Sequence, residues 1–475
     1  MPNKGKLHYT ILFVDGIWTE KMGIMSLIPN LQRAGFDVHL LLTRNDRKML
    51  RRVSEIKPDF VAFSVTTGYH VKALAQARIL KQHFPAIRTI FGGAHITYFP
   101  EIVLDPAVDI GFRGECDMAL PKGLQMILDN ADVSEIPNAV GRSIGADGRP
   151  TVVFGPLDDL VEDLDTLPFP DRELYYQYRF FATNFYKTFV VTRGCPYNCA
   201  YCFNHKLREM YLQKGRFIRQ RSPELVVEEG LRVKRNWGLG IAGFDDDLPT
   251  HNRKWLAEVL HLWKEKVDVP YNINATAREL SDPEMVRMLK ETGVWSVSFG
   301  VESGDEALRR KVLNKPIRDE HIIKAGELLR KFDIPFQTYN MLGLPGETIE
   351  QAIKTILINR RIGTRCTKNS IFQPYPGTVL GDNAEAVDLN IELGYERAIP
   401  RGPSGRQMEK LQKLGAMAMR IPLSDHMIRL VLAFPHTPVH DLIFWFYYST
   451  TIKKCIKTGY LRLFEVGLRT LTDLF

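Results

Sequence analysis

Short apolar, β-rich runs alternate with amphipathic stretches twice along this chain, once near its start and once in its middle. From residue 8 to about 125 the runs are YTILFVDG, DVHLLLT, FVAFSVTT, TIFGGAH and DIGFRG, with helical patterns between them. This alternation predicts parallel strands joined by crossover helices, because parallel neighbours need a long connection. The first series therefore predicts a doubly wound, Rossmann-like α/β domain whose ligands lie in the loops that follow the strands.

The second series runs from TFVVTRG to KNSIFQPYP and contains six strand-like runs separated by helical patterns. Such a series predicts a partial (β/α)6 barrel whose site lies at the carboxyl ends of the strands. The segment between the two series is rich in turn residues, and the strand rhythm disappears after the second one. We therefore expect a Rossmann-like domain over 1–130, a linker over 131–187, the barrel over 188–384 and a mostly helical C-terminal region over 385–475.

Three of the six cysteines stand within eight positions in CPYNCAYC, which we call the cysteine loop: Cys195, Cys199 and Cys202. Three thiolates from one tight turn suit three corners of a cubane iron–sulfur cluster, and they leave one iron open to a ligand that is not protein. The alternative is a structural zinc site in which His205 supplies the fourth ligand. The spacing alone leaves both sites open.

Composition narrows the class of protein and its compartment. Hydrophobic residues make up 45% and charged residues 25% of the chain, and the net charge of +8 is spread without a block of like charges, so we expect no nucleic-acid partner. No signal-peptide pattern and no membrane-spanning run is found, which predicts a cytoplasmic protein. In that reducing compartment the cysteine loop favours metal ligation over disulfides. The isolated Cys116, Cys366 and Cys455 are expected to be buried structural thiols.

The cysteine loop, with Tyr201 before its last cysteine, resembles the cluster motif of the radical S-adenosylmethionine (SAM) enzymes. The later segments GFDDDLPT, WSVSFGVES, MLGLPGET and PYPGT resemble, in order and spacing, the subfamily that carries a cobalamin-binding domain before the barrel. The front of the chain resembles that domain at FGGAHITYFPE and DIGFRGECD. The resemblance implies three cofactors, namely a [4Fe-4S] cluster, SAM and cobalamin.

The resemblance also places SAM-binding residues at the carboxyl ends of the barrel strands. It implies that Asp246 accepts hydrogen bonds from the ammonium group of SAM and that Arg278 pairs with its carboxylate. Each position also has a plainer structural role, such as capping a helix, shaping a turn or lying at the surface. The full set expected around SAM is Tyr201, Asp246, Arg278, Glu302, Ser303, Gly343 and Gly346.

The front domain departs from the family pattern in its first loop. This loop reads DGIWTEKMG and lacks the histidine that would coordinate cobalt, so cobalamin is expected to bind base-off with no protein nitrogen on the metal. His95 is expected to form a hydrogen bond at a strand end rather than to bind cobalt. A doubly wound domain kept without its cofactor is the alternative. The residues expected to line cobalamin are Ser64, Thr66, Gly92 and Gly93.

By resemblance, the leading functional hypothesis is a cobalamin-dependent radical methyltransferase that acts on an unactivated carbon, or phosphorus, of a small-molecule or lipid substrate. An external electron donor such as flavodoxin or ferredoxin is implied. The alternatives are an oxidative cyclase or rearrangement enzyme, as in the anaerobic cyclisation of magnesium-porphyrin esters, and a non-catalytic corrinoid or SAM sensor. The aromatic and basic residues over 444–469 fit a helix packed on the barrel, or alternatively a helix at the inner membrane face.

Overall fold

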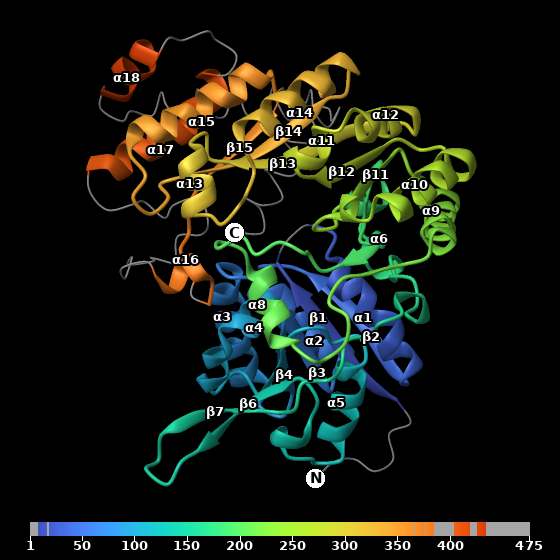
Figure 1. Cartoon of the computed structure of the whole chain (residues 1–475). Coiled ribbons are helices and arrows are strands. Elements are labelled where there is room, and N and C mark those ends of the chain that lie inside the picture. The colour runs from blue at the N-terminus through green and yellow to red at the C-terminus, as the bar shows by residue number, and fades with distance from the viewer. Residues whose placement is uncertain are drawn as a thin grey trace. The chain divides into compact units, whose positions relative to one another are not determined.

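The computed structural model describes residues 8–16, 19–364, 366–375, 377–383, 403–418 and 425–433, and it separates them into two compact units (Figure 1). The front unit comprises the described residues up to Asn184 together with Tyr211–Phe217. The barrel unit comprises Phe185–Met210 and the described residues from Ile218 onward.

A seven-stranded sheet forms the front unit, with the strand order β2-β1-β3-β4-β5-β6-β7. Strands β1 to β5 are parallel, and the hairpin of β6 and β7 extends the sheet with antiparallel pairing. The order reverses between β1 and β3, which is the point where doubly wound sheets bind ligands. The strands are β1 (Tyr9–Asp15), β2 (Phe36–Leu42), β3 (Phe60–Ser64), β4 (Arg88–Gly92), β5 (Ile110–Phe112), β6 (Ala139–Ile144) and β7 (Pro150–Phe154).

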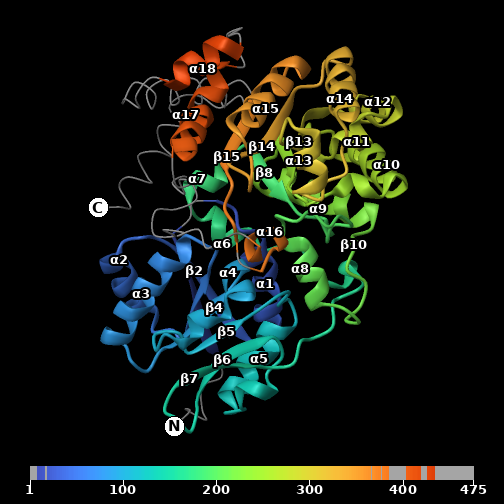
Figure 2. The same cartoon turned by 60° about the vertical axis from the view of Figure 1, so that its left-hand side comes forward.

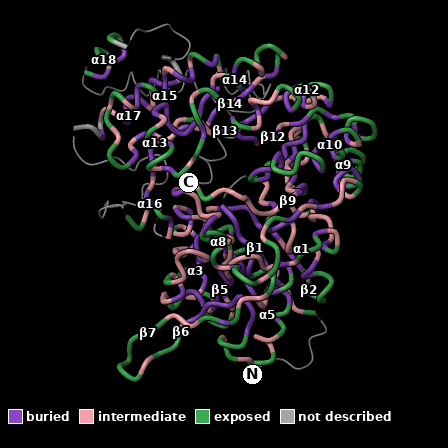
Figure 3. Tube along the Cα trace, viewed as in Figure 1, coloured by how far each residue is buried: buried purple, intermediate pink, exposed green. Residues whose placement is uncertain are grey.

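Helices follow each of the first five strands, as crossover connections require. Strand residues such as Leu12, Val61 and Phe91 are fully buried, because helices cover the parallel sheet (Figure 3). The helices are α1 (Met22–Arg33), α2 (Asp46–Ile56), α3 (Tyr69–His83), α4 (Ala94–Tyr98), α5 (Ala119–Leu128), α6 (Glu173–Tyr176) and α7 (Arg179–Ala182), with 3-10 turns η1 (Pro100–Leu104), η2 (Val133–Glu135) and η3 (Leu164–Thr166). The predicted doubly wound fold is confirmed.

The barrel unit contains an open parallel sheet of six strands in the order β15-β14-β13-β12-β11-β8. Its edges are β8 and β15, which matches the partial barrel predicted from six strand-like runs. The strands are β8 (Tyr186–Phe189), β11 (Ile241–Phe244), β12 (Tyr271–Ala275), β13 (Val294–Glu302), β14 (Phe336–Leu342) and β15 (Cys366–Ile371), and the short β9 (Thr192–Arg193) and β10 (Arg219–Gln220) pair separately.

Helices cover the outer face of this sheet, and the buried Trp263 packs edge-on against Phe189 and Phe244 beneath them. Gly230 lies so close that an added Cβ would come within 2.5 Å of the indole ring. The helices are α8 (Phe203–Met210), α9 (Pro223–Trp237), α10 (Arg253–Leu262), α11 (Ala277–Leu280), α12 (Pro283–Glu291), α13 (Glu306–Lys311), α14 (Asp319–Lys331), α15 (Ile349–Ile362), α16 (Val379–Asp382), α17 (Pro403–Ala418) and α18 (Asp425–Ala433), with the turn η4 (Pro249–His251) and the π-helix η5 (Trp263–Val267).

Buried amides join the last two strands to helix α15. Asn340 on β14 donates to Asn369 on β15 at 3.0 Å and accepts from Asn359 on α15 at 2.8 Å. Thr338 donates to Asn359 at 2.6 Å, so the network satisfies polar groups that the sheet and helix enclose. Helix α17 lies beside α15 in both views (Figures 1 and 2), and its Gln412 donates to the carbonyl of Asn369 at 3.1 Å.

The C-terminal region is described only in α17 and α18, and both segments are helical as predicted. The stretch 444–469, to which the two helix hypotheses apply, lies outside the described residues. Among the residues that the structure describes, no helix is both long and apolar enough to cross a lipid bilayer.

Candidate functional site

A cavity of about 370 Å³ lies at the carboxyl ends of the barrel strands, where the second series of motifs predicts a site. Three cysteines and four of the residues expected around SAM line it, so residues from four separate segments meet there. The predicted residues that line the cavity are Cys195, Cys199, Cys202, Tyr201, Asp246, Arg278 and Glu302. Ser303, Gly343 and Gly346 are not among its lining residues.

The cysteine loop presents three thiols to the cavity in a largely buried environment. Burial raises the pKa of the Cys195 thiol to about 11, that of Cys202 to about 12, and that of Cys199 above its usual value. Thiols of this kind stay protonated at neutral pH until a positively charged group replaces the protons. The loop is therefore suited to a metal centre whose positive charge favours the thiolates.

His205, the fourth ligand in the zinc alternative, is hydrogen-bonded to the backbone of the cysteine loop. Its Nδ1 atom lies 2.5 Å from the carbonyl oxygen of Cys202, within the first turn of α8. Among the described residues, no three His, Cys, Asp or Glu side chains gather closely enough to hold a single metal ion. The geometry gives the zinc alternative no support.

Asp246 follows β11 and is 1% exposed. Its Oδ1 atom accepts from the backbone N–H groups of Val191 and Thr192 at 2.8 and 2.5 Å and from the Thr192 hydroxyl at 2.7 Å. Its Oδ2 atom is buried and has no hydrogen-bond partner among the described residues. Burial raises the pKa of this carboxyl to about 7, against the opposing effect of those hydrogen bonds. Asp246 thus fixes the strand that leads to the cysteine loop and keeps one acceptor oxygen unused.

Glu302 ends β13 in the left-handed region, with φ of 64°. Its Oε1 atom accepts from Tyr201 Oη at 3.0 Å and from Lys315 Nζ at 2.8 Å. Ser303, the next residue, is fully buried, and its Oγ accepts from the backbone N–H of Asp305 at 3.2 Å. Of this neighbouring pair, the structure brings only the glutamate into the cavity.

Arg278 and the MLGLPGET turn complete the expected set in the barrel unit. Arg278 lies in α11, lines the cavity and is exposed, as a fork donor toward a ligand would need to be. Gly343 and Gly346 both have positive φ, of 77° and 72°. Glu347 accepts from the backbone N–H of Gly343 at 2.6 Å, and burial raises the pKa of its carboxyl to about 7. In the described structure these three residues form the turn before α15.

The strand ends of the front unit present accessible backbone. Gly93 is exposed with φ of 95°, and an added Cβ would lie 2.9 Å from the carbonyl oxygen of Val65, so a side chain there is strained. At Gly92 the nearest atom to an added Cβ is 3.9 Å away. Ser64 and Thr66 are half-buried in the loop after β3 beside these glycines. Gly92 therefore has space beside its Cα atom, whereas Gly93 is closely packed against the loop after β3.

His95 is buried beside that loop. Its Nδ1 atom lies 3.1 Å from the Thr67 hydroxyl, and its ring stacks on His70 and on Phe99 with centroids 3.7 and 4.9 Å apart. Burial, with a smaller contribution from His70, lowers the pKa of His95 to about 3, so its imidazole stays neutral. The hydrogen bond expected for this histidine is confirmed.

Comparison with known families agrees with both units. The family model described as the Radical SAM superfamily matches residues 189–357, and the model described as the B12 binding domain matches residues 14–122. The first match contains the whole cysteine loop, and the second contains the front loops that surround Gly93. The chain belongs to the radical SAM superfamily. Within it, the chain is one of the enzymes that carry a cobalamin-binding domain before the barrel.

The relatives of this radical SAM enzyme have more than one activity in their names. It is 26% identical to an uncharacterized methyltransferase of Pyrococcus horikoshii, over 78% of this chain and 80% of that one. It is also 26% identical to the anaerobic magnesium-protoporphyrin IX monomethyl ester cyclase of Rubrivivax gelatinosus, over 73% of this chain but only 62% of that one. The radical SAM methyltransferase TsrM from Kitasatospora setae, solved with cobalamin and a [4Fe-4S] cluster, has a TM-score of 0.63 at 17% identity and covers 78% of this chain and 77% of its own.

The residues of this radical SAM enzyme fit the cofactors that its two domains imply. A [4Fe-4S] cluster and SAM belong to the radical SAM domain, and cobalamin belongs to the B12-binding domain, which confirms the three cofactors expected from the sequence. The three thiols share one cavity with the unused acceptor of Asp246 and the exposed guanidinium of Arg278. In the front unit, the match to the B12 binding domain contains Ser64, Thr66, Gly92 and Gly93.

Several polar residues of the barrel cavity were not singled out by the sequence. Asn274 on β12 donates to the carbonyl of Asp246 at 3.0 Å, and Thr276 caps α11 through its side chain. Tyr339 on β14 and Lys315 after α13 also line the cavity. The two strand residues could have been predicted from the sequence. Asn274 and Tyr339 alternate with buried neighbours along their strands, so their side chains point to the opposite face of the sheet, toward the cavity. Lys315 carries no such signal.

Proposed function

We propose that this chain is a cobalamin-dependent radical SAM methyltransferase. The observation that carries the proposal is an intact cysteine loop that lines one cavity with Asp246, Arg278 and Glu302, in a chain that also has a B12-binding domain. Similarity to the uncharacterized methyltransferase of Pyrococcus horikoshii supports the proposal, because the aligned region spans most of both chains.

The barrel residues have distinct roles in this proposal. Cys195, Cys199 and Cys202 hold the cluster, which when bound supplies the electron that splits SAM, while cobalamin carries the methyl group. Asp246 accepts hydrogen bonds from the ammonium of SAM through its unused oxygen, and Arg278 donates to the carboxylate. Two points of attachment of opposite charge fix the orientation of a zwitterionic ligand.

Glu302 is proposed to accept a hydrogen bond from the ribose part of SAM. Tyr201 and Lys315 occupy only its Oε1 atom, so Oε2 is available to the ligand. Ser303, Gly343 and Gly346 remain predicted SAM contacts that lie outside the cavity lining. In the front unit, the residues proposed to line cobalamin are Ser64, Thr66, Gly92 and Gly93. Cobalamin is proposed to bind there base-off, with no protein nitrogen on cobalt.

The substrate is proposed to be a small molecule or lipid methylated at an unactivated carbon or at phosphorus, with flavodoxin or ferredoxin as the electron donor. The test is anaerobic reconstitution with cluster, cobalamin and SAM, followed by measurement of 5′-deoxyadenosine. Mass spectrometry of extracts from cells with and without the gene would then identify the substrate. It is the compound whose mass is lower by one methylene unit in the cells that lack the gene. Absence of 5′-deoxyadenosine from a fully loaded enzyme would contradict the proposal.

An oxidative cyclase is the second candidate, favoured by the similarity to the Rubrivivax gelatinosus enzyme over 73% of this chain. SAM labelled in its methyl group separates the two. A methyltransferase moves the label into the product, whereas a cyclase leaves the label in methionine and consumes SAM only to form the radical.

Membrane contact is a separate proposal that concerns residues 444–469. An apolar aromatic run followed by lysines and arginines suits an interfacial helix at the inner membrane face, and it would favour a lipid substrate. Flotation with anionic liposomes should recover the full chain but not a chain that ends near residue 438. Equal recovery of both proteins would contradict the membrane contact and leave a helix packed on the barrel.

A further inference from the structure

Lys315 forms a buried ion pair inside the barrel cavity. Its Nζ atom lies 2.8 Å from Glu302 Oε1, and the two side chains are only 11% and 10% exposed. Tyr201 Oη donates to the same Oε1 atom at 3.0 Å and lies 3.5 Å from Lys315 Nζ. The three polar ends therefore meet at one point in the cavity that the cysteine loop also lines.

The backbone of β13 is shaped around this ion pair. A Cβ added at Gly300 would lie 2.0 Å from Glu302 Oε1 and 2.6 Å from Lys315 Nζ, so any side chain there would displace the pair. The register of β13 against β14 shifts between Gly300 and Glu302, and Glu302 takes a left-handed backbone conformation. Strained backbone of this kind persists only where surrounding contacts hold it.

The segment Leu313–Lys315 is hydrogen-bonded to the cysteine loop. The backbone N–H of Ala200 donates to the carbonyl of Leu313 at 2.9 Å, and Asn314 Nδ2 donates to the carbonyl of Asn198 at 2.8 Å. Lys315 and Cys199 both line the barrel cavity. The lysine charge is thus held beside one of the three thiols that the cluster needs.

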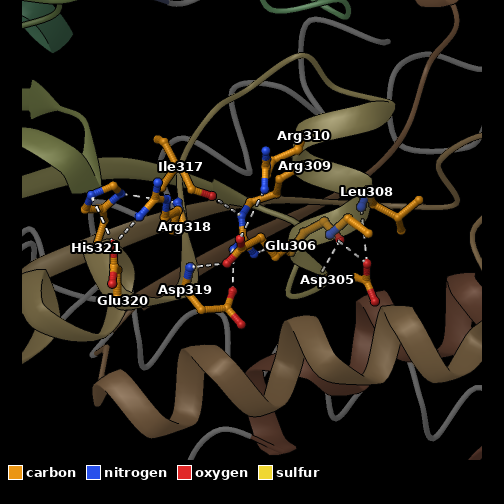
Figure 4. Close-up of polar contacts among 12 residues, drawn as sticks. Asp305, Glu306, Leu308, Arg309, Arg310, Ile317, Arg318, Asp319, Glu320 and His321 are labelled. Atoms are coloured by element: carbon orange, nitrogen blue, oxygen red, sulfur yellow. Dashed lines mark hydrogen bonds and ion pairs between the residues drawn. The ribbon is translucent and has the colours of Figure 1, made fainter.

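Arg309 holds both ends of the connection that carries Lys315. Its guanidinium is fully buried and donates to the carbonyl of Ser303 at 2.6 Å and to that of Ile317 at 3.0 Å. Figure 4 shows this guanidinium with Ile317 and with Asp319, whose carboxylate it also contacts. Ser303 follows the glutamate of the ion pair, and Ile317 lies two residues after the lysine. One side chain therefore restrains both partners.

We propose that Lys315 is a positioning residue whose fixed positive charge offsets the negative charges of Glu302 and the cysteine loop and makes the cluster easier to reduce. The proposal rests on the proposed function, which requires a reduced cluster. In that step one electron passes from an external one-electron reductant to the cluster, whose charge becomes one unit more negative. No protein bond forms or breaks. A positive charge held nearby stabilises the more negative state, and the glutamate acts in the opposite direction.

The test compares charge variants of the anaerobically reconstituted full chain. Lys315→Met should lower the ratio of reduced to oxidised cluster about tenfold at a given potential, which corresponds to a midpoint about 59 mV more negative. Glu302→Gln should shift the midpoint in the opposite direction, and Lys315→Arg should leave it near that of the wild type. Electron paramagnetic resonance at a series of set potentials measures the reduced fraction. The matched control is Lys311→Met, because Lys311 is an exposed lysine at the end of α13. This variant should leave the midpoint potential of the cluster unchanged.

The signs of the shifts decide the outcome. Shifts of the same sign in Lys315→Met and Glu302→Gln, or no shift in either, would overturn the proposal. Loss of cluster iron in Lys315→Met would also overturn it, because Lys315 would then have a structural role only. The measurement needs no methyl acceptor. Opposite shifts in a protein that transfers no methyl group would therefore contradict the proposed function and leave this assignment standing.

Discussion

Replacement of Asp246 by asparagine and by alanine should separate its structural role from its role in binding SAM. Asp246→Ala removes the acceptor of three hydrogen bonds and leaves the buried N–H groups of Val191 and Thr192 without a partner. Each orphaned donor costs roughly 1–3 kcal/mol, so the free energy of unfolding should fall by about 2–6 kcal/mol. Asp246→Asn keeps an oxygen at the Oδ1 position and should lose much less stability. Denaturant unfolding of both variants measures the difference.

Binding of SAM should weaken in Asp246→Asn although this variant keeps most of its stability. The asparagine replaces the unpartnered Oδ2 atom with an NH₂ group, which cannot accept a hydrogen bond from the ammonium of SAM. A hydrogen bond to a charged group is worth roughly 1.5–3 kcal/mol, so Kd for SAM should rise about 10- to 150-fold. Asp247→Asn is the control, because Asp247 is an exposed carboxylate that lines the same cavity. Wild-type affinity in Asp246→Asn, or a loss of affinity in Asp247→Asn alone, would refute the assignment.

The pKa of Asp246 adds a pH test with a defined sign. Burial raises this pKa to about 7, whereas an aspartate in the unfolded chain titrates near pH 4. Between these values the folded state binds one more proton than the unfolded state, so stability should fall as pH rises from about 4 to about 7, by up to about 4 kcal/mol. Asp246→Asn should lack this component. The affinity for SAM should weaken below about pH 7, where the carboxylate becomes protonated. A wild-type stability profile identical to that of the asparagine variant would contradict the buried ionisation.

Three further predictions concern the cysteine loop and the front unit. Replacing all three cysteines of the cysteine loop by alanine should abolish cluster iron and brown colour, whereas alanine at Cys116 and Cys366 should leave iron stoichiometry unchanged. Gly93→Ala should lower the free energy of unfolding by about 1–3 kcal/mol in a denaturant titration, because φ is 95° and the new Cβ would lie 2.9 Å from the Val65 carbonyl. Spin-resonance spectra of bound cob(II)alamin should show no nitrogen splitting, and a splitting lost in His95→Ala would contradict base-off binding without a protein ligand.

Much of the fold could be predicted because it follows from local alternation along the chain. Runs such as VSFGVES and the helical patterns between them fix which segments form strands, and parallel neighbours then bring their carboxyl ends to one edge of the sheet. That edge is where the structure places the cysteine loop, Asp246 and Glu302 in one cavity. Of the three thiols that the sequence predicts to be isolated and buried, Cys366 is buried and Cys116 is partly buried, while Cys455 lies outside the described residues.

Residues that act across loops could not be predicted in the same way. Lys315 lies in an irregular connection with no periodicity, and its contact with Glu302 depends on how α13 and β13 pack. Arg309 reads as one more basic residue of a helix, yet it is fully buried. Neighbouring residues at a strand end were also difficult to separate, since side chains alternate in direction and only Glu302, not Ser303, reaches the cavity.

Helix α17 covers part of β15, an edge strand of the barrel sheet that could otherwise pair with strands from other chains. Gln412 occupies the carbonyl of Asn369 on the edge strand β15, and a Cβ added at Gly415 would lie 2.4 Å from the amide of the same asparagine. An edge with its backbone acceptor occupied and a helix packed against it is a poor template for intermolecular pairing. The amide pair of Asn340 and Asn369 also opposes a one-residue slip, which would leave both amides facing the wrong neighbours. The same few side chains thus limit strand pairing at the β15 edge and fix the register of β15 against β14.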